Sequence, residues 1–87
     1  MAKILVQELV TPGCQICAIV KKFFEEKLKP AHPDIEVEYI DALGQHGQEL
    51  LAKHGIFASP AIFINGELFS VGGLDETKFL EKIKELR

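Results

Sequence analysis

The chain has 87 residues, of which 47% are hydrophobic and 26% are charged, and its formal net charge at pH 7 is -3. This size and composition predict one globular domain over residues 1–87 and argue against a disordered segment. The small acidic charge provides no basic surface, so we expect neither nucleic acid nor an anionic membrane as a partner.

The N-terminal region carries no apolar run of the length that a secretory signal or a membrane span requires. The longest run there, Ile4 to Val6, ends at Gln7. We therefore expect a cytoplasmic protein, and we expect it to be a monomer.

The first predicted elements are a strand and a helix. Residues 4–10 are mostly apolar and end at the turn signal of residues 11–13, which indicates a short buried strand. The helix should follow at once, because apolar residues then recur at spacings of three and four and should share one buried face. Those residues are Ile16, Ile19, Val20, Phe23, Phe24 and Leu28. Pro30 and Pro33 are expected to end the helix.

The middle of the chain is predicted to add a second strand and a second helix. Residues 35–40 alternate apolar and acidic side chains, which is typical of a strand with one polar face, at or near the edge of a sheet. Residues 48–54 should form a brief helix that ends at Gly55.

The last third of the chain contains the clearest turn signal. Asn65-Gly66, between apolar residues 61–64 and residues 67–71, is typical of a two-residue type I′ hairpin. Asp75 should cap a final helix. We expect that helix to bury Phe79, Leu80, Ile83 and Leu86.

The order of these elements predicts an α/β fold with a four-stranded mixed sheet and three helices (β-α-β-α-β-β-α). Strands joined by a helical crossover are expected to be parallel with a right-handed connection, whereas the two hairpin strands must be antiparallel.

Cys14 and Cys17 carry the clearest chemical signal, a Cys-x-x-Cys pair between the first strand and the first helix. Unpaired amides and the macrodipole at a helix N-terminus favour an anion, so Cys14 is expected to have a lowered pKa and to be the attacking thiolate. Cys17, one turn further, can attack a mixed disulfide on Cys14 and release the reduced partner. A disulfide ring this small adds only about 2 kcal/mol in the chain-entropy model, which favours a working dithiol over a structural one.

A metal-binding or iron–sulfur carrier that uses the same two sulfurs is the alternative. Zinc needs two further ligands, and His46 and His54 are eight positions apart, where zinc fingers use a separation of about four to six. Pro12 stands where copper carriers usually have methionine. The sequence therefore favours redox chemistry, with no metal ligands and with the Cys14–Cys17 disulfide in place of a cofactor.

Three segments of the chain match known motifs. Residues 11–17 are similar to the glutaredoxin active-site loop, residues 53–61 resemble the approach to the cis-proline of the thioredoxin superfamily, and residues 71–75 resemble the glycine pair that ends its last strand. On these motifs the chain resembles small thioredoxin-like and glutaredoxin-like proteins over nearly its whole length.

The resemblance implies a minimal thioredoxin fold and a thiol-disulfide oxidoreductase that reduces or exchanges protein disulfides. It also implies that the Ser59–Pro60 bond is cis, although an X-Pro bond taken alone is usually trans. The expected substrate-binding residues are Pro12, Gly13, Ile16, Ser59, Pro60, Gly72 and Gly73. Ile16 and Phe57 are candidates for an apolar rim around the dithiol, or for the core.

Glu8 is the third candidate catalytic residue. It lies six residues before Cys14, the offset at which thioredoxins place a buried acid that moves protons for the second cysteine, and strand alternation puts it on one face with Ile4 and Val6. Burial would raise its pKa and make it a usable base for Cys17. The alternative is a carboxylate that is solvated near the strand end.

The electron donor is open between a dithiol reductase and glutathione, and the substrates are expected to be disulfide-bearing proteins. Gln15-Ile16 replaces the Gly-Pro of thioredoxins and the Pro-Tyr of glutaredoxins, and Thr11 stands where glutaredoxins usually carry a cation for a glutathione carboxylate. Residues 72–75 argue the other way, because the corresponding glutaredoxin segment holds the amino end of glutathione. We expect a flavin-dependent dithiol reductase to be the better donor, and a glutathione-dependent glutaredoxin is the alternative.

Overall fold

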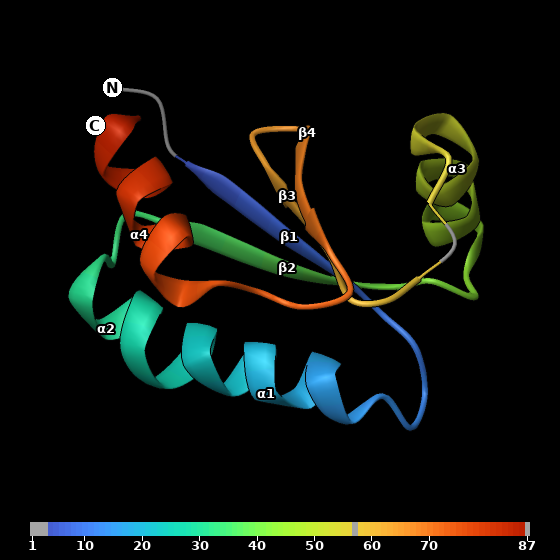
Figure 1. Cartoon of the computed structure of the whole chain (residues 1–87), viewed down its shortest axis with the longest axis horizontal. Helices are drawn as coiled ribbons and strands as arrows, with labels where there is room; N and C mark the ends of the chain where they lie inside the picture. The colour runs from blue at the N-terminus through green and yellow to red at the C-terminus, as the bar shows by residue number, and fades with distance from the viewer. Residues whose placement is uncertain (1–3, 57, 87) are drawn as a thin grey trace.

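The computed structural model describes residues 4–56 and 58–86, and its strands form one four-stranded mixed sheet (Figure 1). In chain order the elements are β1 (Leu5–Val10), α1 (Gln15–Phe23), a π-helical turn (Phe24–Leu28), α2 (Lys29–Ala31), β2 (Glu36–Asp41), α3 (Gln45–His54), β3 (Ala61–Ile64), β4 (Glu67–Val71) and α4 (Glu76–Glu85). Within these described residues, no helix is both long and apolar enough to cross a membrane.

The sheet has the order β2-β1-β3-β4. β1 pairs parallel with β2, whereas β1 with β3 and β3 with β4 pair antiparallel. The predicted mixed sheet is confirmed, and β2 lies at an edge, as its acidic face indicated. The π-helical turn joins α1 to α2 without a break, so the described residues form the three expected helical segments.

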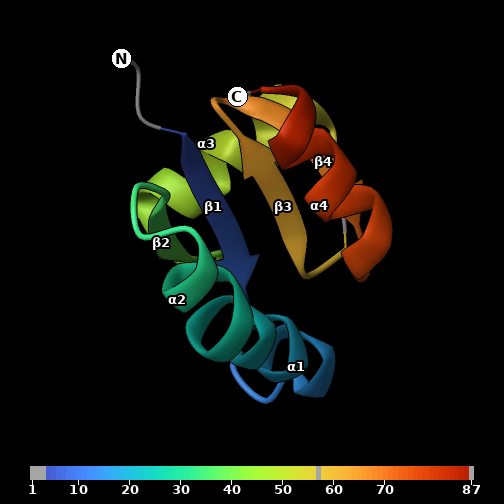
Figure 2. The ribbon, with the colours of Figure 1, turned by 90° about the vertical axis from the view of Figure 1, so that its left-hand side faces the viewer.

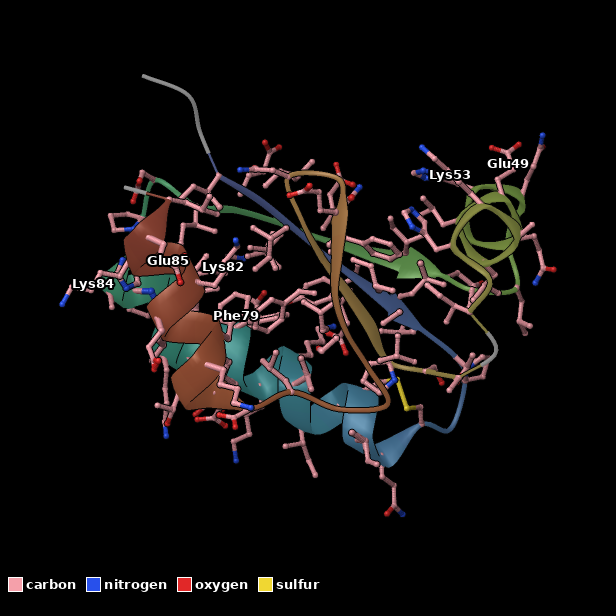
Figure 3. All side chains as sticks on the ribbon, turned by 45° about the horizontal axis from the view of Figure 1, so that its top comes forward. Glu49, Lys53, Phe79, Lys82, Lys84 and Glu85 are labelled. Atoms are coloured by element: carbon pink, nitrogen blue, oxygen red, sulfur yellow. A yellow bond between two sulfur atoms is a disulfide. The ribbon has the colours of Figure 1, made fainter. Side chains whose placement is uncertain are left out.

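The hydrophobic core is divided between the two faces of the sheet. One face of the sheet, called the front face here, packs against α1, the π-helical turn and α4, and the other packs against α3. In Figure 2, α1 and α2 lie below the strands, α4 lies to their right and α3 lies behind them. On the front face Val6 and Ile62 meet the phenylalanines of α1, the π-helical turn and α4, and Phe79 points from α4 into this core (Figure 3). On the other face Leu9 and Phe63 pack with α3. Because side chains alternate along a strand, Glu8 belongs to the front face with Val6.

The local turn and cap signals are confirmed. Asn65 and Gly66 both have positive φ, 51° and 84°, as a type I′ turn requires. The Asp75 carboxylate accepts the Lys78 N–H at 3.1 Å and caps α4. Gly55 ends α3 with φ of 64°. That helix begins at Gln45, three residues earlier than expected, because its first turn contains no large apolar side chain and so carries no apolar periodicity.

Four predicted core residues are exposed. Ile16 and Ile19 of α1 are 49% and 63% exposed, because the buried stripe of the helix follows Cys17, Val20 and Phe23, and the two isoleucines lie just outside it. Likewise α4 buries Phe79 and Ile83, whereas Leu80 and Leu86 each keep 40% of their surface exposed.

The prediction that Pro30 ends the first helix is wrong. The helical segment continues through Pro30 to Ala31, and Pro33 follows its end. In the turn just before the proline, the Lys29 N–H bonds to the Phe24 carbonyl, five residues back. Proline lacks an N–H and clashes with the carbonyl four residues back in an α-helix. The wider π-turn has already interrupted that register, so the chain accommodates the ring.

Candidate functional site

The two cysteines form a disulfide at the start of α1, visible as the yellow bond in Figure 3. Their Cα atoms are 5.2 Å apart. Cys14 is the N-cap of α1 and is partly exposed, whereas Cys17 faces the core and is only 4% exposed. An incoming thiol or disulfide can therefore reach Cys14 but not Cys17.

Hydrogen-bond donors surround the sulfur of Cys14. The Cys17 N–H donates to Cys14 Sγ at 3.0 Å, and the Ser59 hydroxyl donates to the same atom at 3.9 Å. The Ser59 and Thr11 hydroxyls are themselves 2.9 Å apart. These donors and the N-terminus of α1 are placed to stabilise a thiolate at Cys14 once the disulfide is opened.

Most of the predicted substrate-binding residues come together beside Cys14. The Ser59–Pro60 peptide bond is cis, as expected. The Gly72 N–H donates to the Pro60 carbonyl at 2.7 Å, which joins the proline loop to the end of β4. A side chain at Gly73 would come within 4.0 Å of Ile16, so the glycines also border the exposed isoleucine of α1.

The turn before the dithiol supplies Pro12 and Gly13, and both are exposed. Gly13 has φ of 75°, which an L-residue with a side chain adopts only with strain. This conformation closes the turn in which the Cys14 N–H bonds to the Thr11 carbonyl at 3.3 Å. Phe57, the other candidate for the apolar rim, lies outside the described residues.

Glu8 is fully buried, and so the solvated alternative is wrong. Within residues 4–56 and 58–86, neither of its carboxylate oxygens has a hydrogen-bond partner. Burial raises the pKa of Glu8 from 4.5 to about 7, and the positive charge of Lys21 partly opposes this rise. Its strand neighbours in register are Tyr39 and Ile62.

The sequence interpretation missed two residues near the site, Lys21 and Tyr39. The sequence indicates only that Lys21 lies on the solvent-exposed face of the first helix. In the structure its Nζ lies 5.0 Å from the centre of the Tyr39 ring. A cavity of about 460 Å³ extends over the dithiol and includes both residues. Its lining residues are Val10, Thr11, Gly13, Cys14, Gln15, Cys17, Ala18, Lys21 and Tyr39. The position of Lys21 one turn after Cys17 was the available signal.

The described part of the chain contains no group of three or more His, Cys, Asp or Glu side chains placed to hold a metal ion. What the arrangement offers chemically is one accessible sulfur, one buried sulfur bonded to it, and a buried acid that titrates near neutral pH.

Comparison with known proteins covers almost the whole chain. A sequence profile of the thioredoxin domain family matches residues 3–85. The thioredoxin of Methanocaldococcus jannaschii is 31% identical over 85 residues, which are 98% of each protein. The crystal structure of Chlamydomonas reinhardtii thioredoxin f2 superposes with a TM-score of 0.74 at 17% identity, over 98% of this chain and 80% of that one. A chain of the ferredoxin:thioredoxin reductase complex with thioredoxin f2 also gives 0.74, at 23% identity, over 98% of this chain and 78% of that one.

Proposed function

The chain belongs to the thioredoxin domain family and is a thiol-disulfide oxidoreductase, and we propose that it reduces disulfides in other proteins. The observation that carries this proposal is the unequal pair of sulfurs, with Cys14 accessible at a helix N-cap and Cys17 buried behind it. A nucleophile must be reachable by its substrate, whereas a resolving thiol needs only to reach the nucleophile.

The first step is attack by the reduced protein. The Cys14 thiolate attacks one sulfur of the substrate disulfide, a bond forms between these two sulfurs, and the substrate S–S bond breaks. The second substrate sulfur leaves as a thiolate and takes a proton from solvent. The Cys17 N–H and the Ser59 hydroxyl favour the attacking thiolate, because both donate to Cys14 Sγ.

The second step is resolution by Cys17. Its thiol is buried, so it must lose a proton before it can attack the mixed disulfide on Cys14. We assign this proton to Glu8, whose pKa of about 7 suits an acid that accepts and returns protons at neutral pH. The Cys14–Cys17 bond forms while the bond between Cys14 and the substrate sulfur breaks, and that sulfur leaves as a thiolate and takes up a proton. Two electrons have then passed from the protein dithiol to the substrate disulfide.

The partners follow from the surface around Cys14. Exposed Ile16 and the adjoining Gly72–Gly73 segment suit backbone and apolar contacts with an extended peptide. We propose a dithiol reductase as the donor that restores the thiols, and the complex of thioredoxin f2 with a reductase supports this choice. We expect the protein to act as a monomer in the cytoplasm.

Single-cysteine variants test the proposed roles. Reduced Cys17→Ser should attack the disulfides of insulin and remain bound as a mixed disulfide, whereas Cys14→Ser should trap nothing. The wild-type protein should accelerate insulin reduction by dithiothreitol, and both variants should lose this activity. Intact mass under non-reducing conditions measures the trapping. A wild-type protein without activity would contradict the function, and trapping by Cys14→Ser alone would reverse the assigned roles.

A further inference from the structure

Tyr39 lies directly beside the buried acid. In the parallel pairing of β1 with β2, Tyr39 is the register partner of Glu8. Residues paired in this way point to the same face of the sheet, so the ring stands on the side where α1 covers the carboxyl group.

Glu25 holds Tyr39 in place from the helical layer. The Tyr39 hydroxyl donates to Glu25 Oε2 at 2.5 Å, and Lys29 Nζ donates to both oxygens of the same carboxylate at 3.1 Å. These two donors lower the pKa of Glu25, and burial together with the Glu25 bond raises the pKa of Tyr39. Both shifts preserve a neutral phenol that donates to a charged carboxylate.

Lys21 is the cation that this arrangement places near Glu8. Its ammonium lies 5.0 Å from the centre of the Tyr39 ring, in a geometry that attracts a cation to an aromatic face. Lys21, Tyr39 and Cys17 line the same cavity over the dithiol. Solvent in this cavity can therefore exchange protons close to the resolving thiol.

We infer that Tyr39, held by Glu25, positions the Lys21 ammonium beside Glu8, and that this charge lowers the pH at which Glu8 exchanges a proton with Cys17. The inference rests on the role proposed above for Glu8. Lys21 from α1 is the charged group that acts on the acid, Tyr39 from β2 is its register partner, and β3 contributes the apolar Ile62. Cys17 lines the same cavity as Lys21 and Tyr39. Lys21 and Tyr39 act as positioning residues, because their effect passes through Glu8.

The physical reason is the charge that Glu8 acquires when it loses its proton. A buried carboxylate without hydrogen-bond partners is strongly disfavoured unless an opposite charge lies near it. An ammonium that moved freely in water would be screened, whereas one held against an aromatic ring remains close enough to favour the ionised acid.

Two adjacent lysines provide a matched pair of variants for the test. We would compare Lys21→Met, Lys21→Arg and Lys22→Met in the full chain, because Lys22 is exposed and faces Glu26 at 4.0 Å. The titration of the Glu8 carboxyl carbon, followed by ¹³C NMR, reports the acid itself. The pH profile of insulin reduction reports proton exchange, and thermal unfolding shows whether each variant is folded.

Lys21→Met should move the Glu8 titration and the activity profile to higher pH by about half a pH unit. Lys21→Arg keeps the positive charge, so the Glu8 titration and the activity profile should both stay at their wild-type positions. Lys22→Met should also leave them unchanged. Tyr39→Phe keeps the ring but loses the bond to Glu25, so a smaller shift in the same direction is expected. An equal shift in Lys22→Met, or an unmoved Glu8 titration in Lys21→Met, would refute the inference. An inactive wild-type protein would refute the proposed function itself, and with it the role in proton exchange.

Discussion

At the scale of single residues, Glu8 occupies a position where an apolar side chain would make the protein more stable. It is fully buried, and its neighbours along and across the sheet include Val6 and Ile62. The same desolvation brings the pKa of the acid close to neutral pH, where it can accept a proton and return it. The burial that suits Glu8 to proton transfer therefore also lowers the stability of the protein.

Replacing Glu8 with Gln should stabilise the protein at alkaline pH more than at acid pH. Well below pH 4.5 the carboxyl group is neutral in both states, but between pH 4.5 and about 7 the native state binds more protons than the unfolded state. The free energy of unfolding of the wild-type protein should therefore fall as pH rises, by on the order of 2 to 3 kcal/mol from this residue.

Urea titrations of wild type and Glu8→Gln at pH 5 and pH 8 would measure the difference. We expect the advantage of the variant to grow from pH 5 to pH 8, and an advantage that does not change with pH would show that the acid is solvated. Glu8→Leu should show the same trend and should also slow the resolution step, since the proposed base is gone.

Ser59→Ala should slow the reaction of Cys14 with iodoacetamide in the reduced protein. The substitution removes the hydroxyl that lies 3.9 Å from Cys14 Sγ. Loss of one such hydrogen bond to the thiolate should lower the rate at pH 7 about threefold to tenfold. Ser70→Ala is the matched control, because that hydroxyl donates to the Gly73 carbonyl and not to a sulfur. Equal rates for Ser59→Ala and wild type would exclude Ser59 as a donor to the thiolate.

At the scale of elements, the features that could be predicted are those set by neighbouring residues. Asn65-Gly66 and Asp75 act through their own turn and cap, and both appear in the structure as expected. The exposure of Ile16 and Ile19 could not be predicted, because periodicity shows which residues share a face but not how much of that face the rest of the fold covers.

The site residues also divide into those that the sequence predicts and those that it does not. Cys14 and Cys17 follow from their spacing, and Glu8 follows from its offset in the family. The contact of Lys21 with Tyr39 depends instead on how α1 crosses the sheet and on the register of β1 with β2, which separate segments of sequence do not reveal.

Gly47→Ala should destabilise the protein, although Gly→Ala in a helix ordinarily stabilises it by about 1 kcal/mol. A Cβ at Gly47 would lie 2.6 Å from the Cα and 2.9 Å from the carbonyl carbon of Ala42, so the backbone of the loop before α3 would have to move. We expect a loss of about 2 kcal/mol in the free energy of unfolding.

Gly44→Ala is the matched control for Gly47→Ala, because it adds the same methyl group near α3 without a close backbone contact. A Cβ at Gly44 would meet the Asp41 carbonyl oxygen at 3.4 Å, which is ordinary contact, and so a loss below about 1 kcal/mol is expected. Denaturant unfolding of both variants measures the two losses. A Gly47→Ala protein as stable as wild type would mean that the loop moves away from α3 freely.

At the scale of the whole molecule, the strand directions explain why the site forms at one end of the sheet. Leu9 near the end of β1 pairs with Ala61 at the start of β3, and Ala61 pairs with Val71 at the end of β4. The dithiol turn, the proline loop and the glycine pair are the segments that continue from these three strand ends. The mixed topology therefore brings Cys14 together with Pro60, 46 positions later in the chain, and with Gly72, 58 positions later.

The charge around this end of the molecule predicts that glutathione is a poor electron donor and that a dithiol reductase is a better one. Glutathione carries two carboxylates, and a site that selects it should offer cations to them. Lys21 is the single cation among the described residues that line the cavity over Cys14, and it already contacts Tyr39. The Thr11 hydroxyl, where glutaredoxins usually carry a cation, is bonded to Ser59. One missing charged hydrogen bond reduces affinity about tenfold to a hundredfold.

A coupled assay can compare the two donors on the oxidised protein, with NADPH, glutathione reductase and glutathione in one arm and NADPH with a thioredoxin reductase in the other. We expect faster NADPH oxidation in the second arm, by about tenfold or more. Thr11→Lys should raise turnover by glutathione about tenfold, because it supplies a cation beside Cys14. Rapid reduction of the wild-type disulfide by glutathione would contradict the prediction, because the exposed backbone around Gly72 would then suffice to bind glutathione without a dedicated cation.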